Sequence, residues 1–336
     1  MNKRILAMAL TGAMTVGMLA GCGGDKAPTG SGAGASGGDK NVGVILKTTS
    51  SEYWQYVKAG AEAYGKEMGE KMGVKVEVKG ATSETAYDEQ QNMIETDLNS
   101  GAYDALVIAP LQADLVKTLV AGTETPIIAV DTKIDAPEVL SFVGTGNVNA
   151  GAVGGKAAVE AAKAAGWKEV KCIEICGVQG DSTNEDRKEG YAKGVNEAGG
   201  EFLMDETQYA DAVADKAVNC MEAIMQSHPE GIAIICANND DMAMGAARAA
   251  KGHEAYKNTI FMGFDGNMSA CEAIKAGNLT MSVIQDAYGM GYKAVEAAVK
   301  VLNGEKIEKF IDSGTGVVDA SNVDDRIATL NGYLGK

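Results

Sequence analysis

The chain has 336 residues, which allows about two domains and a sizeable buried core. Hydrophobic residues make up 46% and charged residues 23%, so the composition argues against a largely disordered chain and against a small disulfide-stapled fold. Thirty Lys and Arg against 46 Asp and Glu give a formal net charge of -16, which excludes a basic surface for nucleic acid. The chain has only two His, which argues against histidine-based catalysis and against multi-histidine metal sites.

The first 22 residues have the pattern of an export signal. Lys3 and Arg4 precede an apolar run over residues 5–20, which is short for a membrane span. The run closes with Leu19-Ala20-Gly21-Cys22, which resembles a bacterial lipobox, where the cysteine is diacylated and becomes the first mature residue. We therefore expect lipidation at Cys22 and an extracytoplasmic protein anchored to the bacterial cell membrane. The alternative is an ordinary cleaved signal with a chance cysteine.

A Gly, Ser and Ala-rich stretch over residues 23–40 follows and predicts a flexible linker. Five further cysteines remain, an odd number that a full set of disulfides within one chain cannot absorb. Cys172 and Cys176 lie in one predicted strand, too far apart for a disulfide. We expect all five to be buried small hydrophobes and expect no metal site, because no Cys-x-x-Cys pair or nearby His completes one.

Short β-branched runs alternate with longer amphipathic stretches from Asn41 onward. This alternation is typical of βα units around a parallel sheet. Most runs are almost continuously apolar, as strands covered on both faces must be. The predicted strands are 42–46, 74–78, 105–109, 127–130, 170–175, 232–236, 260–263 and 279–284. Four precede residue 131 and four follow residue 169, which favours two lobes with one sheet each.

Between the first two predicted strands, apolar side chains recur every three or four residues. This spacing predicts a helix with one face on the sheet, carried by Tyr53, Val57, Ala61, Tyr64, Met68 and Met72. Thr49-Ser50-Ser51-Glu52 fits a capping box at its start.

Polar residues at the carboxyl ends of parallel strands carry the most information about a ligand, because ligands bind outside those ends. Asp131 and Asp265 each follow a predicted strand and can accept hydrogen bonds from two hydroxyls. Asn239 and Gln285 can both donate and accept, and Arg187 can donate as a fork. Two carboxylates against one guanidinium argue against a strongly anionic ligand. The set therefore suits a neutral polyol.

A sugar ring also needs a flat apolar wall, which Tyr53 and Trp54 can supply. Each residue of the set has an ordinary structural explanation as well. Asp at a strand end often caps a helix, Asn after a strand often belongs to a turn, and Tyr53 is at least as easily a core residue. The combination at corresponding positions of successive βα units is what favours a binding site.

Several segments carry a resemblance to the periplasmic sugar-binding proteins of ABC importers, of the ribose- and galactose-binding type. The similar segments are Thr-Thr-Ser-Ser-Glu-Tyr-Trp at 48–54, Pro-Ile-Ile-Ala-Val-Asp at 126–131, Val-Gly-Thr-Gly-Asn at 143–147, Arg187 in Asn-Glu-Asp-Arg-Lys-Glu-Gly-Tyr, Asn-Asp-Asp-Met-Ala-Met-Gly-Ala at 239–246, and Gly-Phe-Asp-Gly at 263–266. The resemblance spans essentially residues 41–318.

The resemblance implies a type I periplasmic binding protein: α/β, with two doubly wound parallel-sheet lobes joined by a three-strand hinge. It places the first lobe at 41–145 plus 286–312 and the second at 146–285 plus 313–336. The implied ligand-binding residues are Ser51, Tyr53, Trp54, Asp131, Asn147, Arg187, Asn239, Asp265 and Gln285.

Three positions depart from the ribose-binding pattern. Ser51 replaces a longer amide, Thr132 replaces an Arg, and the aromatic wall of the second lobe is missing near Ala212, where Tyr209 is a candidate substitute. Ribose itself is therefore not the expected ligand. No Asp-x-Asn-x-Asp loop is present, so the calcium site of galactose binders is not expected.

The expected function is a monomeric, non-enzymatic binding protein that delivers a sugar or polyol to an ABC transporter permease, without a cofactor or nucleic acid. A receptor that reports to a chemoreceptor or sensor kinase, or a binder of a nucleoside or other solute, would have the same lobes. Glycoside hydrolysis by Asp131 and Asp265 is a further alternative. The sequence lacks a nucleophile elbow, a P-loop and a dinucleotide loop, and its N-terminus carries no helix-turn-helix.

Overall fold

Two β-sheets organise the part of the chain that the structure describes, residues 39–333 and 335 of the computed structural model. The predicted leader with Cys22 and nearly all of the predicted linker lie outside the described residues. No helix among the described residues is both long and apolar enough to cross a membrane.

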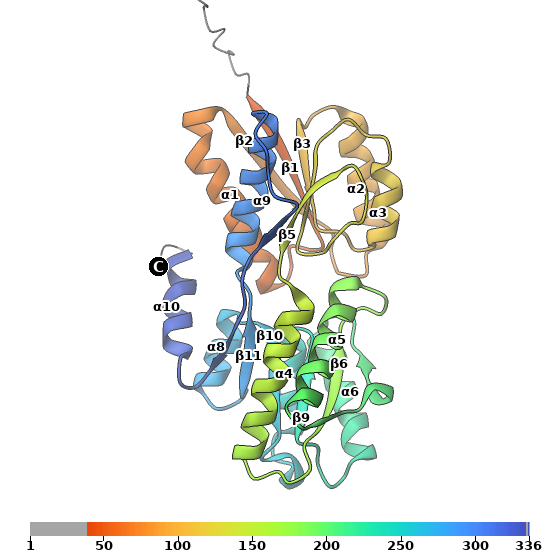
Figure 1. Ribbon diagram of the computed structural model, residues 1–336, viewed down its shortest axis with the longest axis vertical. Helices are drawn as coiled ribbons and strands as arrows, with labels where there is room; N and C mark the ends of the chain where they lie inside the picture. The colour runs from red at the N-terminus through yellow and green to blue at the C-terminus, as the bar shows by residue number, and fades with distance from the viewer. Residues whose placement is uncertain (1–38, 334, 336) are drawn as a thin grey trace, which may run out of the picture. The chain divides into compact units, whose positions relative to one another are not determined.

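The first sheet has six strands, all paired in parallel. Their order is β12 (Phe310–Asp312), β5 (Val139–Gly144), β4 (Ile127–Val130), β3 (Ala105–Ile108), β1 (Lys40–Leu46) and β2 (Val74–Gly80). Four helices accompany it, α1 (Glu52–Met72), α2 (Tyr87–Ser100), α3 (Ala113–Val120) and α9 (Ala287–Leu302). Helices α1 and α9 cover one face, and α2 and α3 the other (Figure 1).

The second sheet has seven strands. Their order is β13 (Gly316–Asp319), β11 (Met281–Ile284), β10 (Ile260–Asp265), β9 (Ile234–Ala237), β6 (Lys171–Cys176) and β7 (Glu201–Phe202), with β8 (Gln208–Tyr209) also paired to β6. All its pairs are parallel except β11 with β13. The surrounding helices are α4 (Asn147–Ala164), α5 (Ser182–Glu197), α6 (Ala214–Ser227), α7 (Asp240–Ala250), α8 (Met268–Lys275) and α10 (Val323–Tyr333), with short 3₁₀ turns at Met204–Glu206 and Glu254–Tyr256.

The second sheet shows why the strands read as continuous apolar runs. Alternate residues of one strand enter two separate cores: Ile173 and Ile175 pack on the side of α6 and α7, whereas Cys172 packs on the side of α4 and α5. Both faces are covered, so a polar side chain in the buried part of these strands needs a buried partner. The prediction of doubly wound parallel sheets is confirmed.

Helices α1 and α9 approach each other closely enough to require glycine. A Cβ atom at Gly60 would lie 1.9 Å from the carbonyl oxygen of Tyr288, and one at Gly291 would lie 1.9 Å from that of Val57. Because real Cβ atoms do not approach so closely, these two glycines fix the packing of two helices that are distant in the sequence.

The predicted capping box at Thr49–Glu52 is wrong. Ser51 is the N-cap of α1, but its side chain makes no capping hydrogen bond. The carboxylate of Glu52 instead accepts hydrogen bonds from the backbone N–H groups of Met268 (3.1 Å) and Ser269 (3.2 Å), and from the Ser269 hydroxyl (2.5 Å). A side chain from the first lobe thus caps α8 of the second, an interaction that local sequence cannot reveal.

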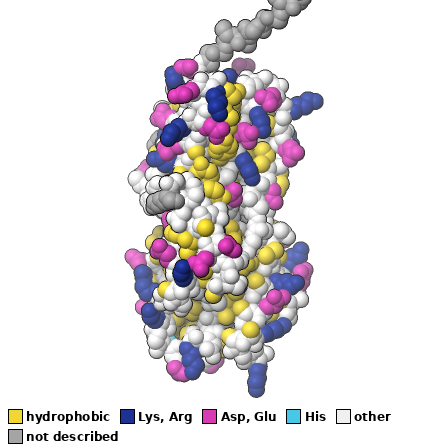
Figure 2. All heavy atoms as spheres, turned by 90° about the vertical axis from the view of Figure 1, so that its left-hand side faces the viewer, with side chains coloured by type: hydrophobic (Ala, Val, Ile, Leu, Met, Phe, Trp, Pro, Cys, Tyr) yellow, Lys and Arg dark blue, Asp and Glu magenta, His cyan; other side chains and the backbone are white. Residues whose placement is uncertain are grey.

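The surface carries charges of both signs. On the face that includes α10, Lys and Arg side chains are interspersed with Asp and Glu, and the acidic excess does not gather in one area (Figure 2). Apolar side chains lie between them, as on most soluble proteins.

Candidate ligand-binding site

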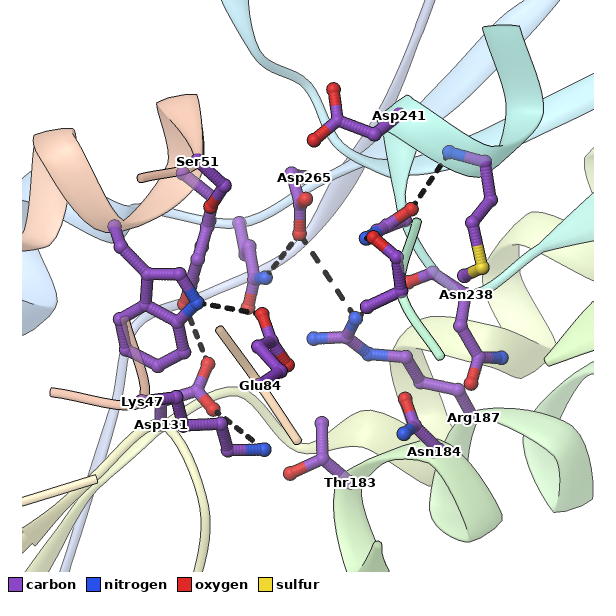
Figure 3. Close-up of a pocket in the computed structure, with 16 residues that line it drawn as sticks. Lys47, Ser51, Glu84, Asp131, Thr183, Asn184, Arg187, Asn238, Asp241 and Asp265 are labelled. Atoms are coloured by element: carbon purple, nitrogen blue, oxygen red, sulfur yellow. Dashed lines mark hydrogen bonds and ion pairs between the residues drawn. The ribbon is translucent and has the colours of Figure 1, made fainter. Parts of the chain in front are cut away.

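The carboxyl ends of the strands in both sheets border one small cavity (Figure 3). Its lining comes from both lobes. The lining residues are Lys47, Ser51, Tyr53, Trp54, Glu84, Asp131, Thr183, Asn184, Arg187, Ala212, Asn238, Asn239, Asp241, Met242, Asp265 and Gln285. All the implied ligand-binding residues except Asn147 are among them.

The start of α1 supplies the aromatic side of the cavity. Tyr53 and Trp54 are buried, with ring centroids 5.0 Å apart and planes at 80°. The Tyr53 hydroxyl donates to Asp131 Oδ1 at 2.7 Å, and the Trp54 indole N–H donates to Glu84 Oε1 at 2.8 Å. Burial, followed by the charge of Asp131, raises the pKa of Tyr53 well above its ordinary value, so the phenol stays a donor. Tyr53 is therefore both a core residue and a wall.

Arg187 is held in place from several sides. Its Nε donates to Asn147 Oδ1 at 2.9 Å and its Nη1 to the carbonyl oxygen of Asn238 at 2.6 Å. The guanidinium lies over the Phe264 ring, 3.7 Å from the centroid, and Nη1 is 4.0 Å from Asp265 Oδ1. Asn147 thus positions Arg187 and does not line the cavity, which differs from the role that the resemblance implied.

Asp265 ends β10 and faces the guanidinium. Its Oδ1 accepts from Gln285 Nε2 at 2.6 Å. Burial and then the charge of neighbouring Asp240 raise its pKa well above the ordinary value, while Arg187 and the Gln285 hydrogen bond oppose the rise. Asp240 itself accepts from Ser282 Oγ and from the backbone N–H of Asn267, and burial raises its pKa to about 7.

Backbone strain is concentrated at the cavity. Among the described residues, Asp131 (φ 64°), Ala212 (φ 60°) and Asp265 (φ 122°) have positive φ without being glycine, and all three line it; the neighbouring Asp211 (φ 49°) is the fourth such residue. Each costs on the order of 1–3 kcal/mol, and such strain typically persists at functional sites. The surrounding structure therefore aims two carboxylates into the cavity at the expense of stability.

Lys47 directly follows β1 and links the two lobes. Its Nζ lies 2.5 Å from Asp181 Oδ2 and 4.0 Å from Asp131 Oδ2. Burial lowers the pKa of Lys47, but the charges of Asp181 and Asp131 outweigh burial and leave the pKa raised. The ammonium is therefore a fixed positive charge beside the cavity.

Two further predicted residues have local roles. Asn239 lines the cavity, yet its side chain caps α7, with Oδ1 accepting from the Met242 N–H at 2.9 Å. Tyr209 does not line the cavity and does not replace the missing aromatic wall, because its hydroxyl contacts Lys188 and Glu185 instead.

Sequence reasoning missed half of the lining. Lys47 and Glu84 follow the first two strands, so closer attention to those strand ends could have found them. Thr183 and Asn184, in the first turn of α5, have no signal in the sequence alone. The remaining missed residues are Ala212, Asn238, Asp241 and Met242.

The five cysteines among the described residues are all free thiols. Cys172, Cys176, Cys236 and Cys271 are buried free thiols, as expected, whereas Cys220 is only half-buried and departs from the prediction. Within the described part of the chain, no group of three or more His, Cys, Asp or Glu side chains is placed to hold a metal ion.

Known proteins share both the sequence and the fold. Residues 42–306 match the family described as periplasmic binding protein domain. The chain is 30% identical over 275 residues to the ribose import binding protein of Bacillus subtilis (strain 168), covering 81% of this chain and 85% of that protein. It is also 30% identical over 274 residues to the D-allose-binding periplasmic protein of Escherichia coli (strain K12), covering 79% of this chain and 85% of that protein.

A solved structure agrees. The carbohydrate transporter solute binding protein from Agrobacterium radiobacter, in complex with D-arabinose, matches with a TM-score of 0.79 and 30% identity, covering 87% of this chain and 98% of that one. These relatives are binding proteins and not enzymes, in agreement with the expectation for this chain. The chain belongs to the periplasmic binding protein family and has its two-lobed type I fold.

Proposed function

We propose that this chain captures a small neutral sugar or polyol between its two lobes and delivers it, as a monomer, to the permease of an ABC importer. The observation that carries the proposal is the convergence of Asp131, Asp265 and Arg187 with the Tyr53 and Trp54 rings in one cavity between the lobes. Carboxylates accept from hydroxyls, the guanidinium donates, and the rings cover the C–H faces of a sugar.

The relatives support the class of ligand. The solved structure from Agrobacterium radiobacter holds D-arabinose, and the curated relatives are named for ribose and allose. The shared chemistry of these ligands is a ring or chain of neutral hydroxyls, which the cavity of this chain is equipped to satisfy.

The lobe boundaries proposed are 41–145 plus 286–312 and 146–285 plus 313–336. The sheet membership supports them, because β12 joins the first sheet and β13 the second. The chain then crosses between the lobes three times, and Thr145 Oγ1 links all three crossings through hydrogen bonds to Gln285 Oε1 (2.9 Å) and Ser313 Oγ (2.7 Å).

The proposed location is extracytoplasmic, with a lipid anchor at Cys22. The family supports the compartment, and the lipobox-like Leu19-Ala20-Gly21-Cys22 supports the anchor.

A thermal-shift screen tests the proposal. Pentoses, hexoses, polyols and nucleosides are each added at millimolar concentration, because a ligand at 100 times its dissociation constant stabilises the folded state by about 2.7 kcal/mol. We expect a sugar or polyol to raise the melting temperature without product formation. A shift by nucleosides alone, or turnover of a sugar, would contradict the proposal.

A further inference from the structure

Glu84 enters the cavity from the loop between β2 and α2, a segment that the resemblance does not mark. Figure 3 shows its side chain in the middle of the lining residues. Its Oε1 accepts the Trp54 indole N–H at 2.8 Å, and no second hydrogen bond to this carboxylate is found among residues 39–333. One carboxylate oxygen is thus committed to Trp54 and the other is available to a ligand.

The hydrogen bond determines what Trp54 can offer. An indole has a single donor, and Glu84 uses it. Trp54 therefore presents only its apolar ring to the cavity. The orientation of the Trp54 ring determines how a sugar ring can pack against it. Because Glu84 fixes that orientation, Glu84 controls how a sugar ring can lie in the cavity.

Glu84 also shapes the charge of this end of the cavity. The charged groups that face it are Lys47 after β1, Asp131 after β4 and Asp181 at the N-cap of α5. Lys47 is already paired with Asp181 at 2.5 Å. A ligand here meets an acceptor-rich environment, which favours hydroxyl donors and repels a carboxylate or phosphate in a poorly solvated space.

We propose that Glu84 is a specificity-determining residue: it holds Trp54 as an apolar wall and uses its second carboxylate oxygen to accept from a ligand hydroxyl, while excluding anionic sugars. The proposal rests on the proposed function, because it assigns a role in the same site. It adds a named residue and a selectivity, neutral over anionic, to that site.

The first test compares neutral sugars with their anionic counterparts by calorimetry. The probe pairs are D-galactose with D-galacturonate, D-glucose with D-glucuronate, and D-ribose with D-ribose 5-phosphate. The variants are Glu84→Gln, which keeps an oxygen for Trp54 but loses the charge, Glu84→Ala, which loses both, and Glu160→Gln on the exposed face of α4 as the control.

We expect wild type and the control to bind the neutral member of a pair and to discriminate against the anionic one. In Glu84→Gln, the dissociation constant of the anionic sugar divided by that of its neutral counterpart should fall by tenfold or more. Glu84→Ala should weaken the binding of the neutral sugar more than Glu84→Gln does. An unchanged ratio in Glu84→Gln overturns the specificity role and leaves the sugar-binding function standing. If no probe binds the wild type, the specificity role falls together with the function.

The second test needs no ligand. In a Trp167→Phe background, Trp54 is the sole tryptophan, and its fluorescence is followed from pH 4 to pH 9. Burial, the largest influence, raises the pKa of Glu84 above its ordinary value, so wild type should show a transition above the ordinary carboxyl range. Glu84→Gln should lack it. A transition that persists in Glu84→Gln arises from another group and overturns the assignment of Glu84 as the group that holds Trp54.

Discussion

Several polar side chains that face the cavity are held by the protein itself. Tyr53 holds Asp131, Gln285 holds Asp265, and Asn147 holds Arg187. A ligand therefore meets groups that have already lost their rotamer freedom, and binding costs less entropy than it would with mobile side chains.

Removal of the Asp265 carboxylate should weaken binding. Asp265→Ala leaves the Gln285 amide without its acceptor and deprives the ligand of one, so we expect a loss of about 1–3 kcal/mol, or roughly 5- to 150-fold in dissociation constant. Isothermal calorimetry with the sugar found by the screen measures it. Glu160→Ala is the surface control, and equal affinities for the two variants would contradict the site assignment.

Glu174 should make stability depend on pH. It is fully buried in β6; Oε1 accepts from Asn238 Nδ2 at 2.5 Å and Oε2 has no partner among the described residues. Burial raises its pKa from 4.5 to about 8. The folded state therefore binds more protons than the unfolded state between those two pH values, and the free energy of unfolding falls as pH rises from 4.5 to 8.

Glu174→Gln removes this titration. In urea denaturation at pH 5, 6.5 and 8.5, the variant should gain stability relative to wild type by a few kcal/mol as pH rises. Parallel pH profiles of wild type and variant would show that Glu174 does not titrate in this way.

At the scale of elements, the strands that could be predicted from the sequence are those that pair with other strands of the same run of βα units. β4 coincides with the prediction, and β1, β3 and β10 differ from it by a few residues. β5, β7, β8, β12 and β13 were missed because they are short or carry polar residues, and β12 and β13 pair with strands far away in the sequence. Tertiary pairing decides such edge strands, and local propensity does not.

The same distinction separates the site residues that were predicted from those that were missed. Asp131 and Gln285 directly follow the apolar strands β4 and β11, and Asp265 ends β10, so the strand-end rule located them. Thr183 and Asn184 lie in the first turn of α5, several residues beyond the end of β6, so the strand-end rule did not reach them.

Glu52 should hold the lobes together across the cleft. Its carboxylate accepts three hydrogen bonds at the N-terminus of α8. Glu52→Ala removes them and favours the open form, which lowers the fraction of protein competent to bind. We expect a dissociation constant about 3- to 30-fold weaker, a faster dissociation rate, and a larger radius of gyration without ligand.

Glu62→Ala is the matched control for this variant, because Glu62 lies on the same helix and, within the described part of the chain, pairs only with Lys58, at 3.7 Å. If the two variants show the same affinity and the same radius of gyration, Glu52 does not contribute to closure.

At the scale of the whole molecule, the cavity draws Tyr53, Trp54 and Asp131 from one lobe and Arg187 and Asp265 from the other. A ligand that touches both sets binds the closed arrangement better than the open one and shifts the population toward it. Small-angle scattering should show a smaller radius of gyration with saturating sugar, and Trp54 fluorescence should change. Unchanged scattering with confirmed binding would mean that one lobe holds the ligand alone.

The proposed anchor predicts where the full-length protein resides. Cys22→Ser removes the only residue that the lipobox-like segment offers for acylation. The variant should leave the membrane fraction or remain unprocessed, because an acidic protein has no charge-based affinity for anionic lipids. Fractionation and intact mass measure this. An unchanged membrane fraction with an unchanged mass would rule out lipidation at Cys22.

The close packing of α1 against α9 has a consequence for synthesis. Gly60 leaves the ribosome early, but Gly291, whose helix covers the same face of the first sheet, follows roughly 230 residues later; at ~5–20 residues per second the delay is on the order of 10–50 s. The second lobe lies almost entirely between these two points. The first lobe is therefore begun first but completed only after most of the second lobe has been made, and a chain truncated before α9 would leave the apolar face of α1 open to chaperones and proteases.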